Sequence, residues 1–246
     1  RPPISTLLPY TTLFRSTSAI EVKGVAIPFV SRGGLKLDKA IKTFGVPLAE
    51  SVCMDIGAST GGFTDCMLQH AAKRVYAVDV GYGQLDWKLR QDSRVVNLER
   101  TNIRYITAEQ VPEKIDFFSV DVAFISLKLV LPAVIPFLSD AATGVLLIKP
   151  QFEAGREKVG KGGVVRDPSV HRQVIQDCLD FLDSIHLSLF ALDFSPITGP
   201  NGNIEFLAYV GNCSRSEESA GLRAIDTLEF PQLAEEIVAR AHASLK

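Results

Sequence analysis

The sequence predicts an α/β protein built on one open, mostly parallel sheet of seven strands, with helices on both faces and one antiparallel strand near the end. Two observations predict this class. Short apolar runs alternate with helix-like segments five times along the chain, which is the order of a parallel sheet with crossover helices. Two more strand-like runs follow, joined by a segment rich in Gly, Pro and Asn, which predicts a hairpin-like reversal.

Length and composition are compatible with this fold and argue against several other classes. With 246 residues, the chain is long enough for one large domain with a full core. The net charge of −2 gives no overall attraction to nucleic acid, so any such site has to be a local basic patch. The nearest candidate for a membrane span, residues 117–138, is interrupted by Asp121, Lys128 and two prolines, so no membrane partner is expected. Four scattered cysteines without metal or redox spacing favour a reducing, cytoplasmic compartment.

The beginning of the chain reads differently from the rest. Residues 1–16 show no clear periodicity and contain three prolines, and they resemble a disordered or foreign linker without the layout of a signal peptide. Residues 18–29 are compatible with the last strand and linker of a preceding domain. We therefore expect a leader over residues 1–29 and one folded domain over residues 30–246.

The first helix is expected to open within residues 30–37. Apolar residues from Leu37 to Phe44 recur at helical spacing, and Gly45 ends the pattern. Lys36 falls near the start of this helix and off its apolar stripe, where a cation is unfavourable against the helix dipole. On this fact alone, the simplest interpretation of Lys36 is a solvated lysine.

Residues 52–63 outline a strand, a tight glycine turn and the start of a helix. Glycines let the backbone approach a ligand, and a helix N-terminus offers free N–H groups. The spacing differs from a dinucleotide fingerprint, because Ser59 stands where the second glycine would be. An acid before the glycines repels a phosphate more than a nucleoside with a positive sulfonium, which indicates S-adenosylmethionine. The alternative is a turn whose glycines are only structural. The expected cofactor contacts in this turn are Asp55, Gly57, Ala58, Ser59, Gly61, Gly62 and Phe63.

A second strand, residues 74–79, ends in another acid about twenty residues further on. Asp79 at its tip can accept hydrogen bonds from a ribose diol, and with Val80 it extends the expected cofactor site. The turn over residues 81–85 is placed to cover an adenosine, and residues 94–98 form a third strand.

Two charged residues stand at the ends of the next two strands. Residues 116–124 are nearly all apolar except for Asp121, and an acid in a central strand is costly unless it is paired or functional. Residues 127–138 predict a helix that two prolines kink or end early. Lys149 closes the fifth strand, residues 144–148, and faces the ligand crevice of an open α/β sheet; the alternative is a lysine that snorkels to the rim.

The last third of the chain begins with a glycine-rich segment, residues 151–167, with charges of both signs. It reads as a mobile loop that clamps a phosphate backbone, or as a solvated surface loop. A helix is expected over residues 168–185, capped by Asp167. Two strands follow over residues 187–194 and 204–210, and Glu205 interrupts the second. A terminal helix is expected over residues 231–245.

The polar residues at these element ends, Lys36, Asp121, Lys149 and Glu205, resemble in their order the Lys-Asp-Lys-Glu tetrad of the FtsJ-like ribose 2′-O-methyltransferases. The flanking sequences are similar to the TlyA, or haemolysin-like, branch of that family. They are SRGGLKL, DIGASTGGFTD, YAVDVGYGQL, DVAFISL, IKPQFE and GNIEF, and the resemblance covers about residues 29–210.

The resemblance implies a Rossmann-like class I methyltransferase fold, S-adenosylmethionine as cofactor, and 2′-O-methylation of ribosomal RNA, with cytidine as the expected nucleotide. Family members usually start with an S4-type RNA-binding domain, of which residues 1–29 would keep only the last strand and linker. Asp121 is also expected near the methionine part of the cofactor. The expected partner is ribosomal RNA, free or within a ribosomal subunit.

The implied reaction requires a ribose hydroxyl to lose its proton as it attacks the methyl group. Lys149 is expected to orient and deprotonate this hydroxyl, or to stay charged and stabilise the developing oxyanion. Glu205 is expected to hold a lysine, and the scheme uses no metal. The expected RNA contacts are Arg32, Lys36 and the loop cations Lys158, Lys161 and Arg166, so affinity should fall as salt rises.

Three rival functions are considered. A membrane-lytic protein is disfavoured because the terminal helix carries Glu235 and Glu236 beside its apolar side. A catalytically silent RNA-binding protein is disfavoured by the complete tetrad. A small-molecule methyltransferase of the same fold has no need for two lysines at the crevice, although the fold alone is compatible with it.

Overall fold

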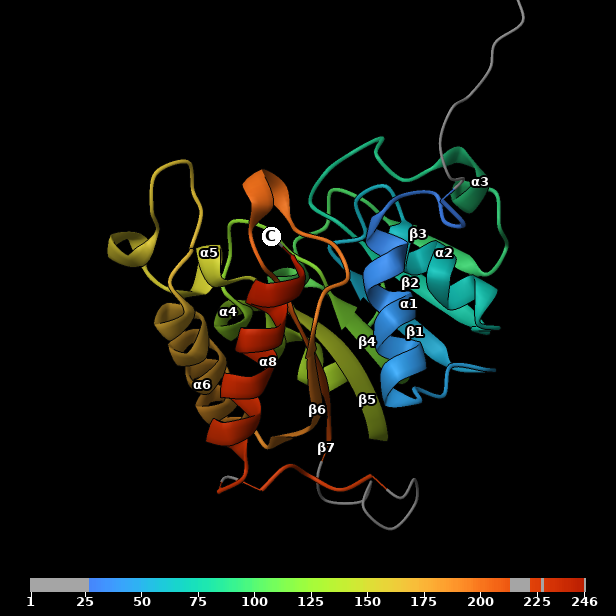
Figure 1. Ribbon diagram of the computed structural model, residues 1–246. Helices are drawn as coiled ribbons and strands as arrows, with labels where there is room; N and C mark the ends of the chain where they lie inside the picture. The colour runs from blue at the N-terminus through green and yellow to red at the C-terminus, as the bar shows by residue number, and fades with distance from the viewer. Residues whose placement is uncertain (1–26, 213–221, 227, 246) are drawn as a thin grey trace, which may run out of the picture.

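The computed structural model describes residues 27–212, 222–226 and 228–245, so all but the last three residues of the expected leader over residues 1–29 lie outside the described residues. Within these ranges, seven strands form one sheet in the order β3-β2-β1-β4-β5-β7-β6 (Figure 1). The strands are β1 (Val52–Ile56), β2 (Arg74–Val78), β3 (Val95–Leu98), β4 (Ile115–Val120), β5 (Leu138–Ile148), β6 (Leu187–Phe194) and β7 (Phe206–Asn212). Strand β7 runs antiparallel to both of its neighbours, and the other pairings are parallel. The predicted sheet is therefore confirmed.

Helices cover both faces of the sheet, as Figure 1 shows. One apolar core lies under α1 (Gly33–Phe44), α2 (Gly62–Gln69) and α3 (Trp87–Arg90). The other lies under α4 (Leu127–Val134), α6 (Pro168–Ser184) and α8 (Phe230–Ser244). Strand β1 is buried over its whole length because helices cover both faces of the sheet. Strands in this position are apolar on both sides.

Two helix ends follow the predicted capping signals. Gly45 adopts a left-handed conformation with φ of 68°, and its N–H donates to Ile41, which closes α1. Asp167 caps α6 by accepting a hydrogen bond from the backbone N–H of Ser169, and Pro168 occupies the first helical position. None of the helices in the described ranges has the length and apolar character needed to cross a membrane.

Four element boundaries differ from the prediction. Strand β4 ends at Val120, so Asp121 lies just beyond it in a loop. Helix α4 ends at Val134 and a 3-10 turn with Pro136 follows, since proline has no N–H to continue the helix. Strand β5 starts at Leu138, where half-exposed polar residues conceal the strand pattern. Strand β7 starts at Phe206, so Glu205 precedes the strand and does not interrupt it.

The strand register places the functional loops at one edge of the sheet. Ile56 at the end of β1 lies level with Val78 of β2 and Val120 of β4. The residues that follow these strands therefore emerge side by side at the upper edge in Figure 1, where α5 (Pro150–Glu153) also lies. Parallel α/β sheets bind their ligands at this edge.

Candidate active site

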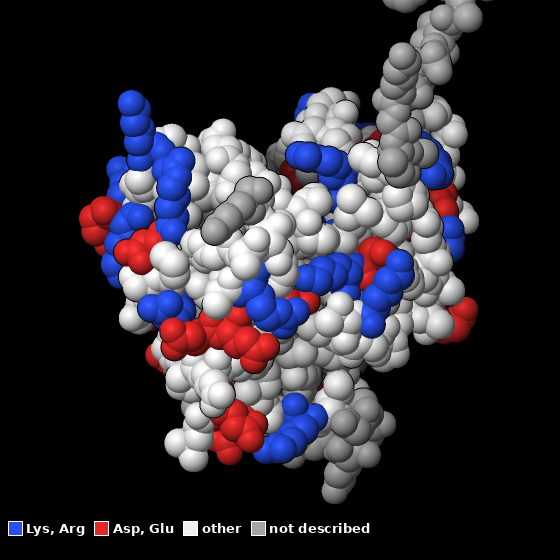
Figure 2. Space-filling view, viewed as in Figure 1, with Lys and Arg blue, Asp and Glu red and all other residues white. Residues whose placement is uncertain are grey.

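A cavity of about 680 Å³ opens at this edge of the sheet. Figure 2 shows a notch in the surface at the same edge. The cavity is lined by the loops after β1, β2 and β4, by the start of α1, and by Lys149 and Glu205. Its volume lies within the range of sites that bind a drug-sized molecule or cofactor, roughly 300–1,000 Å³.

The floor of the cavity depends on Gly57. Its φ is 86°, and a Cβ atom there would lie 2.4 Å from the backbone oxygen of Asp121. The loops after β1 and β4 are tied at this point, because the N–H of Asp121 donates to the oxygen of Ile56 at 2.9 Å. Only glycine allows this close approach without strain.

Most of the expected cofactor residues line this cavity. They are Gly57, Ala58, Ser59, Gly62, Phe63, Asp79, Val80 and Asp121. Asp55 and Gly61 are not among the lining residues. Gly61 is the N-cap of α2 and faces away, since a Cβ there would lie 2.2 Å from Cδ1 of Leu89.

Asp55 lies beneath the glycine loop and is fully buried. Its two carboxylate oxygens accept hydrogen bonds from the hydroxyl groups of Thr64 at 2.7 Å and Ser119 at 2.9 Å. Burial disfavours the charged form and raises the pKa of Asp55 to about 6, although the two hydroxyls act in the opposite direction. Asp55 therefore ties β1 to α2 and to β4 and is not part of the cavity lining.

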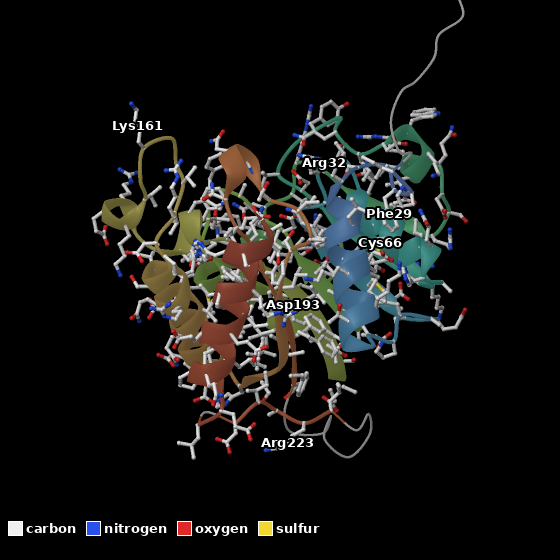
Figure 3. All side chains as sticks on the ribbon, viewed as in Figure 1. Phe29, Arg32, Cys66, Lys161, Asp193 and Arg223 are labelled. Carbon is white, nitrogen blue, oxygen red and sulfur yellow. The ribbon has the colours of Figure 1, made fainter. Side chains whose placement is uncertain are left out.

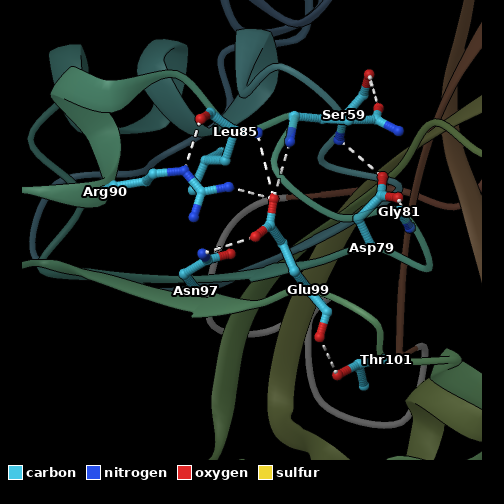
Figure 4. Close-up of polar contacts among 9 residues, drawn as sticks. Ser59, Asp79, Gly81, Leu85, Arg90, Asn97, Glu99 and Thr101 are labelled. Atoms are coloured by element: carbon cyan, nitrogen blue, oxygen red, sulfur yellow. Dashed lines mark hydrogen bonds and ion pairs between the residues drawn. The ribbon is translucent and has the colours of Figure 1, made fainter.

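Asp79 is oriented by backbone amides, as Figure 4 shows. One carboxylate oxygen accepts from the N–H of Ser59 at 2.8 Å and the other from the N–H of Gly81 at 2.6 Å. A carboxylate has about four acceptor sites, so two remain for other donors such as a ribose diol.

The turn beside Asp79 is held by Glu99 (Figure 4). The Glu99 carboxylate accepts from the backbone N–H of Gln84 at 3.0 Å and contacts the guanidinium of Arg90. The hydrogen bond from Arg90 lowers the pKa of Glu99 to about 2, so the contact stays ionised. These bonds hold the turn over residues 81–85 at the cavity, where Gln84 forms part of the lining.

Lys36, Asp121, Lys149 and Glu205 meet at the cavity wall. The ammonium group of Lys149 lies 2.5 Å from one oxygen of Asp121, and that of Lys36 lies 3.9 Å from the other. Lys36 also donates to Glu205 at 2.6 Å. The four groups form a continuous row of alternating charge, Lys149–Asp121–Lys36–Glu205.

Burial explains why these charges are paired. Lys36 is only 8% exposed and Glu205 is fully buried, so the interpretation of Lys36 as a solvated lysine is wrong. A buried charge is costly without a partner, and here each cation has a carboxylate at hand. The backbone makes room for Glu205 at Gly199, where a Cβ atom would lie 2.1 Å from the carboxylate. Such a row fixes the position of Lys149 at the cavity, where its amine can form a hydrogen bond with a hydroxyl group.

Sequence reasoning missed one residue at the mouth of the cavity. Phe124 lines the cavity and is 92% exposed, and its φ of 63° is unusual for an aromatic residue. Its ring lies 5.1 Å from that of Phe152. The apolar sequence around Phe124 predicted that this residue belongs to a strand. The charged residue Asp121 before it was the available sign that the strand ends earlier and that Phe124 lies in a loop.

Of the expected RNA contacts, Arg32 and the three loop cations are exposed, whereas Lys36 is buried at the cavity wall. Arg32 precedes α1, and Figure 3 shows it on the same upper edge as Lys161. Lys158, Lys161 and Arg166 are exposed on the segment after α5. This segment is more ordered than predicted: Gly160 and Val164 pair in an antiparallel bridge, and the Asn203 side chain donates to Gly163 at 2.9 Å.

Comparison with known proteins identifies the family. The model of the family described as FtsJ-like methyltransferase matches residues 29–212. The chain belongs to the FtsJ-like methyltransferase family. The resemblance to the TlyA branch is confirmed by the relatives that follow, and the Rossmann-like methyltransferase fold by the sheet order together with the solved structures.

Several proteins resemble this FtsJ-like methyltransferase closely. "Putative rRNA methyltransferase YqxC" of Bacillus subtilis is 48% identical over 92% of this chain and 79% of its own length. The 16S/23S rRNA (cytidine-2′-O)-methyltransferase TlyA of Mycobacterium tuberculosis is 42% identical over 82% of this chain and 75% of its own. A solved structure described as "Putative hemolysin from Streptococcus thermophilus" is 47% identical, with a TM-score of 0.82 over 90% of this chain and 77% of that one.

Proposed function

We propose that this RNA methyltransferase transfers a methyl group from S-adenosylmethionine to the 2′-hydroxyl of a ribose in ribosomal RNA, with cytidine as the target nucleotide. The row Lys149–Asp121–Lys36–Glu205 at the cavity wall is the observation that carries the proposal. The relatives support the substrate, because the M. tuberculosis TlyA protein bears the name of a ribosomal RNA cytidine 2′-O-methyltransferase. Such a substrate also agrees with the expected cytoplasmic location.

The residues of the cavity fit this cofactor. Gly57 keeps the floor open, and Asp79 presents a carboxylate held by two backbone amides, which suits a ribose diol. The carboxylate of Asp121 provides negative charge for a sulfonium nearby. Bound S-adenosylmethionine would supply an electrophilic methyl group on a positively charged sulfur.

Each of the four row residues has a separate role in methylation of the ribose. To act as the base, Lys149 first gives its ammonium proton to solvent, and the neutral amine then orients the 2′-hydroxyl and takes up the proton that this oxygen loses as it is methylated. Asp121, at 2.5 Å, orients the Lys149 amine. Glu205 holds Lys36, whose ammonium group then faces the second oxygen of Asp121. The alternative role for Lys149 is a fixed positive charge beside the developing oxyanion.

The edge of the cavity suits a single-stranded part of an RNA. Arg32, Lys158, Lys161 and Arg166 are exposed and would contact phosphates. Phe124 offers an exposed aromatic face on which an unstacked base can rest. Binding through these groups should weaken as salt rises, because it releases ions condensed on the RNA.

The proposal is tested by methyl transfer from labelled S-adenosylmethionine to unmodified ribosomal RNA, both free and in ribosomal subunits. We expect label on one or a few riboses, and mapping of 2′-O-methyl groups by resistance to alkaline cleavage names the nucleotide. Label on a base, or no transfer to either form of the RNA, would contradict the proposal. Leakage of liposomes caused by the pure protein would support the membrane-active alternative.

A further inference from the structure

Two loops that carry row residues are joined by a carboxylate outside the row. Strands β4 and β5 are parallel neighbours. The loop after β4 carries Asp121 and leads into α4, whose N-cap is Ser126. Lys149 directly follows β5 and leads into the short helix α5, whose last residue is Glu153.

Glu153 binds the start of α4 with both of its oxygens. One oxygen accepts from the hydroxyl of Ser126 at 2.6 Å, and the other from the backbone N–H of Leu127 at 2.8 Å. The hydroxyl oxygen of Ser126 in turn accepts from the N–H of Lys128 at 3.1 Å. Hydrogen bonds to a carboxylate are about twice as strong as neutral ones, and a helix N-terminus favours negative charge.

An aromatic contact crosses the same gap. Phe152 of α5 packs against Phe124 of the loop after β4, with ring centroids 5.1 Å apart. The ammonium group of Lys149 lies 6.0 Å from the centroid of the Phe152 ring. The two loops are therefore joined by two further contacts beyond the Asp121–Lys149 pair.

We propose that Glu153 is a positioning residue, which ties α5 to the start of α4 and thereby sets the spacing between Lys149 and Asp121. The inference rests on the proposed function, because it gives the purpose of that spacing. Both loops lie at the cavity, so a shift of one relative to the other moves Lys149 away from the hydroxyl that it orients. A displacement of about 1 Å can reduce a rate roughly 100-fold.

The chemistry of the contact explains why a carboxylate is needed. Both groups that face Glu153 are donors, an O–H and an N–H, so two acceptor oxygens are required. Glutamine has the same shape but is neutral and offers one acceptor oxygen, so it can keep the bond from the Leu127 N–H but meets the Ser126 hydroxyl with an NH₂ group. Glu153→Gln therefore removes the charge from both bonds and reverses the direction of one, with little change in volume.

The first measurement is the single-turnover rate of methyl transfer to ribosomal RNA with both substrates saturating. Glu153→Gln should lower this rate about 10- to 100-fold. Affinities for S-adenosylmethionine and RNA should stay within about twofold of wild type, as should the rate of the control Glu157→Gln, an exposed carboxylate four residues later. Ser126→Ala should lose rate, and Ser126→Thr, which keeps the hydroxyl, should recover it. A wild-type rate in Glu153→Gln, or a parallel fall in rate and both affinities, overturns the proposal.

The second measurement does not depend on methyl transfer. Hydrogen–deuterium exchange of the free protein should rise in Glu153→Gln within residues 121–130 and 149–154, and should match wild type in β1 and β2. If wild-type protein transfers no methyl group, the proposed function fails, and this exchange result still decides whether Glu153 joins the two loops. Unchanged exchange in both segments refutes the contact, whereas a rise throughout the sheet shows general destabilisation and also refutes the positioning role.

Discussion

Asp55 and Asp121 lie near the carboxyl ends of the neighbouring strands β1 and β4, in contrasting surroundings. Asp121 lines the cavity and contacts the ammonium groups of Lys149 and Lys36. Asp55 is fully buried and accepts hydrogen bonds from the hydroxyl groups of Thr64 and Ser119. Two acids that sequence reasoning assigned to one cofactor site thus have different partners.

The difference comes from the height of each residue along its strand. Asp55 is still within β1 and lies level with Ser119 of β4, two residues below Asp121. A carboxylate at that depth has no room for a long cation and is held by short hydroxyl side chains. A carboxylate one residue beyond the strand reaches the cavity, where lysines from other elements can pair with it. A strand-end acid is therefore a candidate for ligand contact only once it has passed the last pair of the ladder.

The largest expected effect follows from removing the cation that Asp121 holds. Lys149→Ala should slow methyl transfer by about 10²- to 10⁴-fold, the usual contribution of a group that moves a proton. Binding of S-adenosylmethionine, measured by calorimetry, should persist. Lys73→Ala, an exposed lysine before β2, serves as the control and should behave as wild type. Near-normal turnover of Lys149→Ala would end the assignment, and substantial activity in Lys149→Arg would favour the fixed-charge role over the base.

Matched substitutions of the two acids test the comparison directly. Asp121→Asn removes the partner of two lysines and should cost roughly 10²- to 10³-fold in methyl transfer, in line with the loss of a charge-assisted contact in a site. Asp55→Asn keeps the shape and can still bond both hydroxyls, so its rate should stay within about threefold of wild type. Both rates are measured at one pH with saturating substrates. Equal losses of methyl-transfer rate in the two variants would contradict the view that Asp121 acts in the site and Asp55 does not.

The stability of wild-type protein and that of Asp55→Asn should also respond differently to pH. The pKa of folded Asp55 is about 6, above its ordinary value of 3.8. Protonated Asp55 therefore stabilises the fold below about pH 4, and this contribution is lost as pH rises through about 6. Two pKa units correspond to about 3 kcal/mol, so Asp55→Asn should gain up to about that much relative to wild type between pH 4 and pH 8. Urea unfolding across this range measures the difference, and a constant difference would contradict the expected pKa.

The smallest effect concerns Gly57, which lies between the two acids. Gly57→Ala would place a Cβ atom 2.4 Å from the backbone oxygen of Asp121 at a φ of 86°. The left-handed conformation alone should cost about 1–2 kcal/mol of unfolding free energy. The added methyl should also push Asp121 away from the row and weaken cofactor binding. Gly83→Ala, at a φ of 72° with open space around it, controls for the backbone cost alone.

The sheet was predictable because its strands are buried on both faces. Strands β1 and β2 start where predicted, at Val52 and Arg74, since continuous apolar runs between polar residues mark such strands clearly. The boundary of β4 was not predictable in the same way. The residues after Val120 that line the cavity are also largely apolar. The spacing of apolar residues alone therefore does not show where the strand ends and the cavity loop begins.

The candidate site was only partly open to sequence reasoning. Lys36 and Glu205 are 169 residues apart, so no local pattern links them, and their pairing was implied by the family resemblance. Glu153 escaped notice for the same reason, since its partners lie on another loop. The roles of the four row residues in catalysis stay predictions.

Strand β7 runs against its neighbours, and its first residues therefore start at the edge where the other strands finish. Glu205, the residue just before β7, is delivered to the cavity by a strand that is made late in synthesis. A nascent chain that contains β1 to β5 already holds Lys36 and Asp121 but not yet Glu205, the second carboxylate beside Lys36. The row is therefore complete only once β7 has been inserted between β5 and β6, so its formation depends on closure of the sheet.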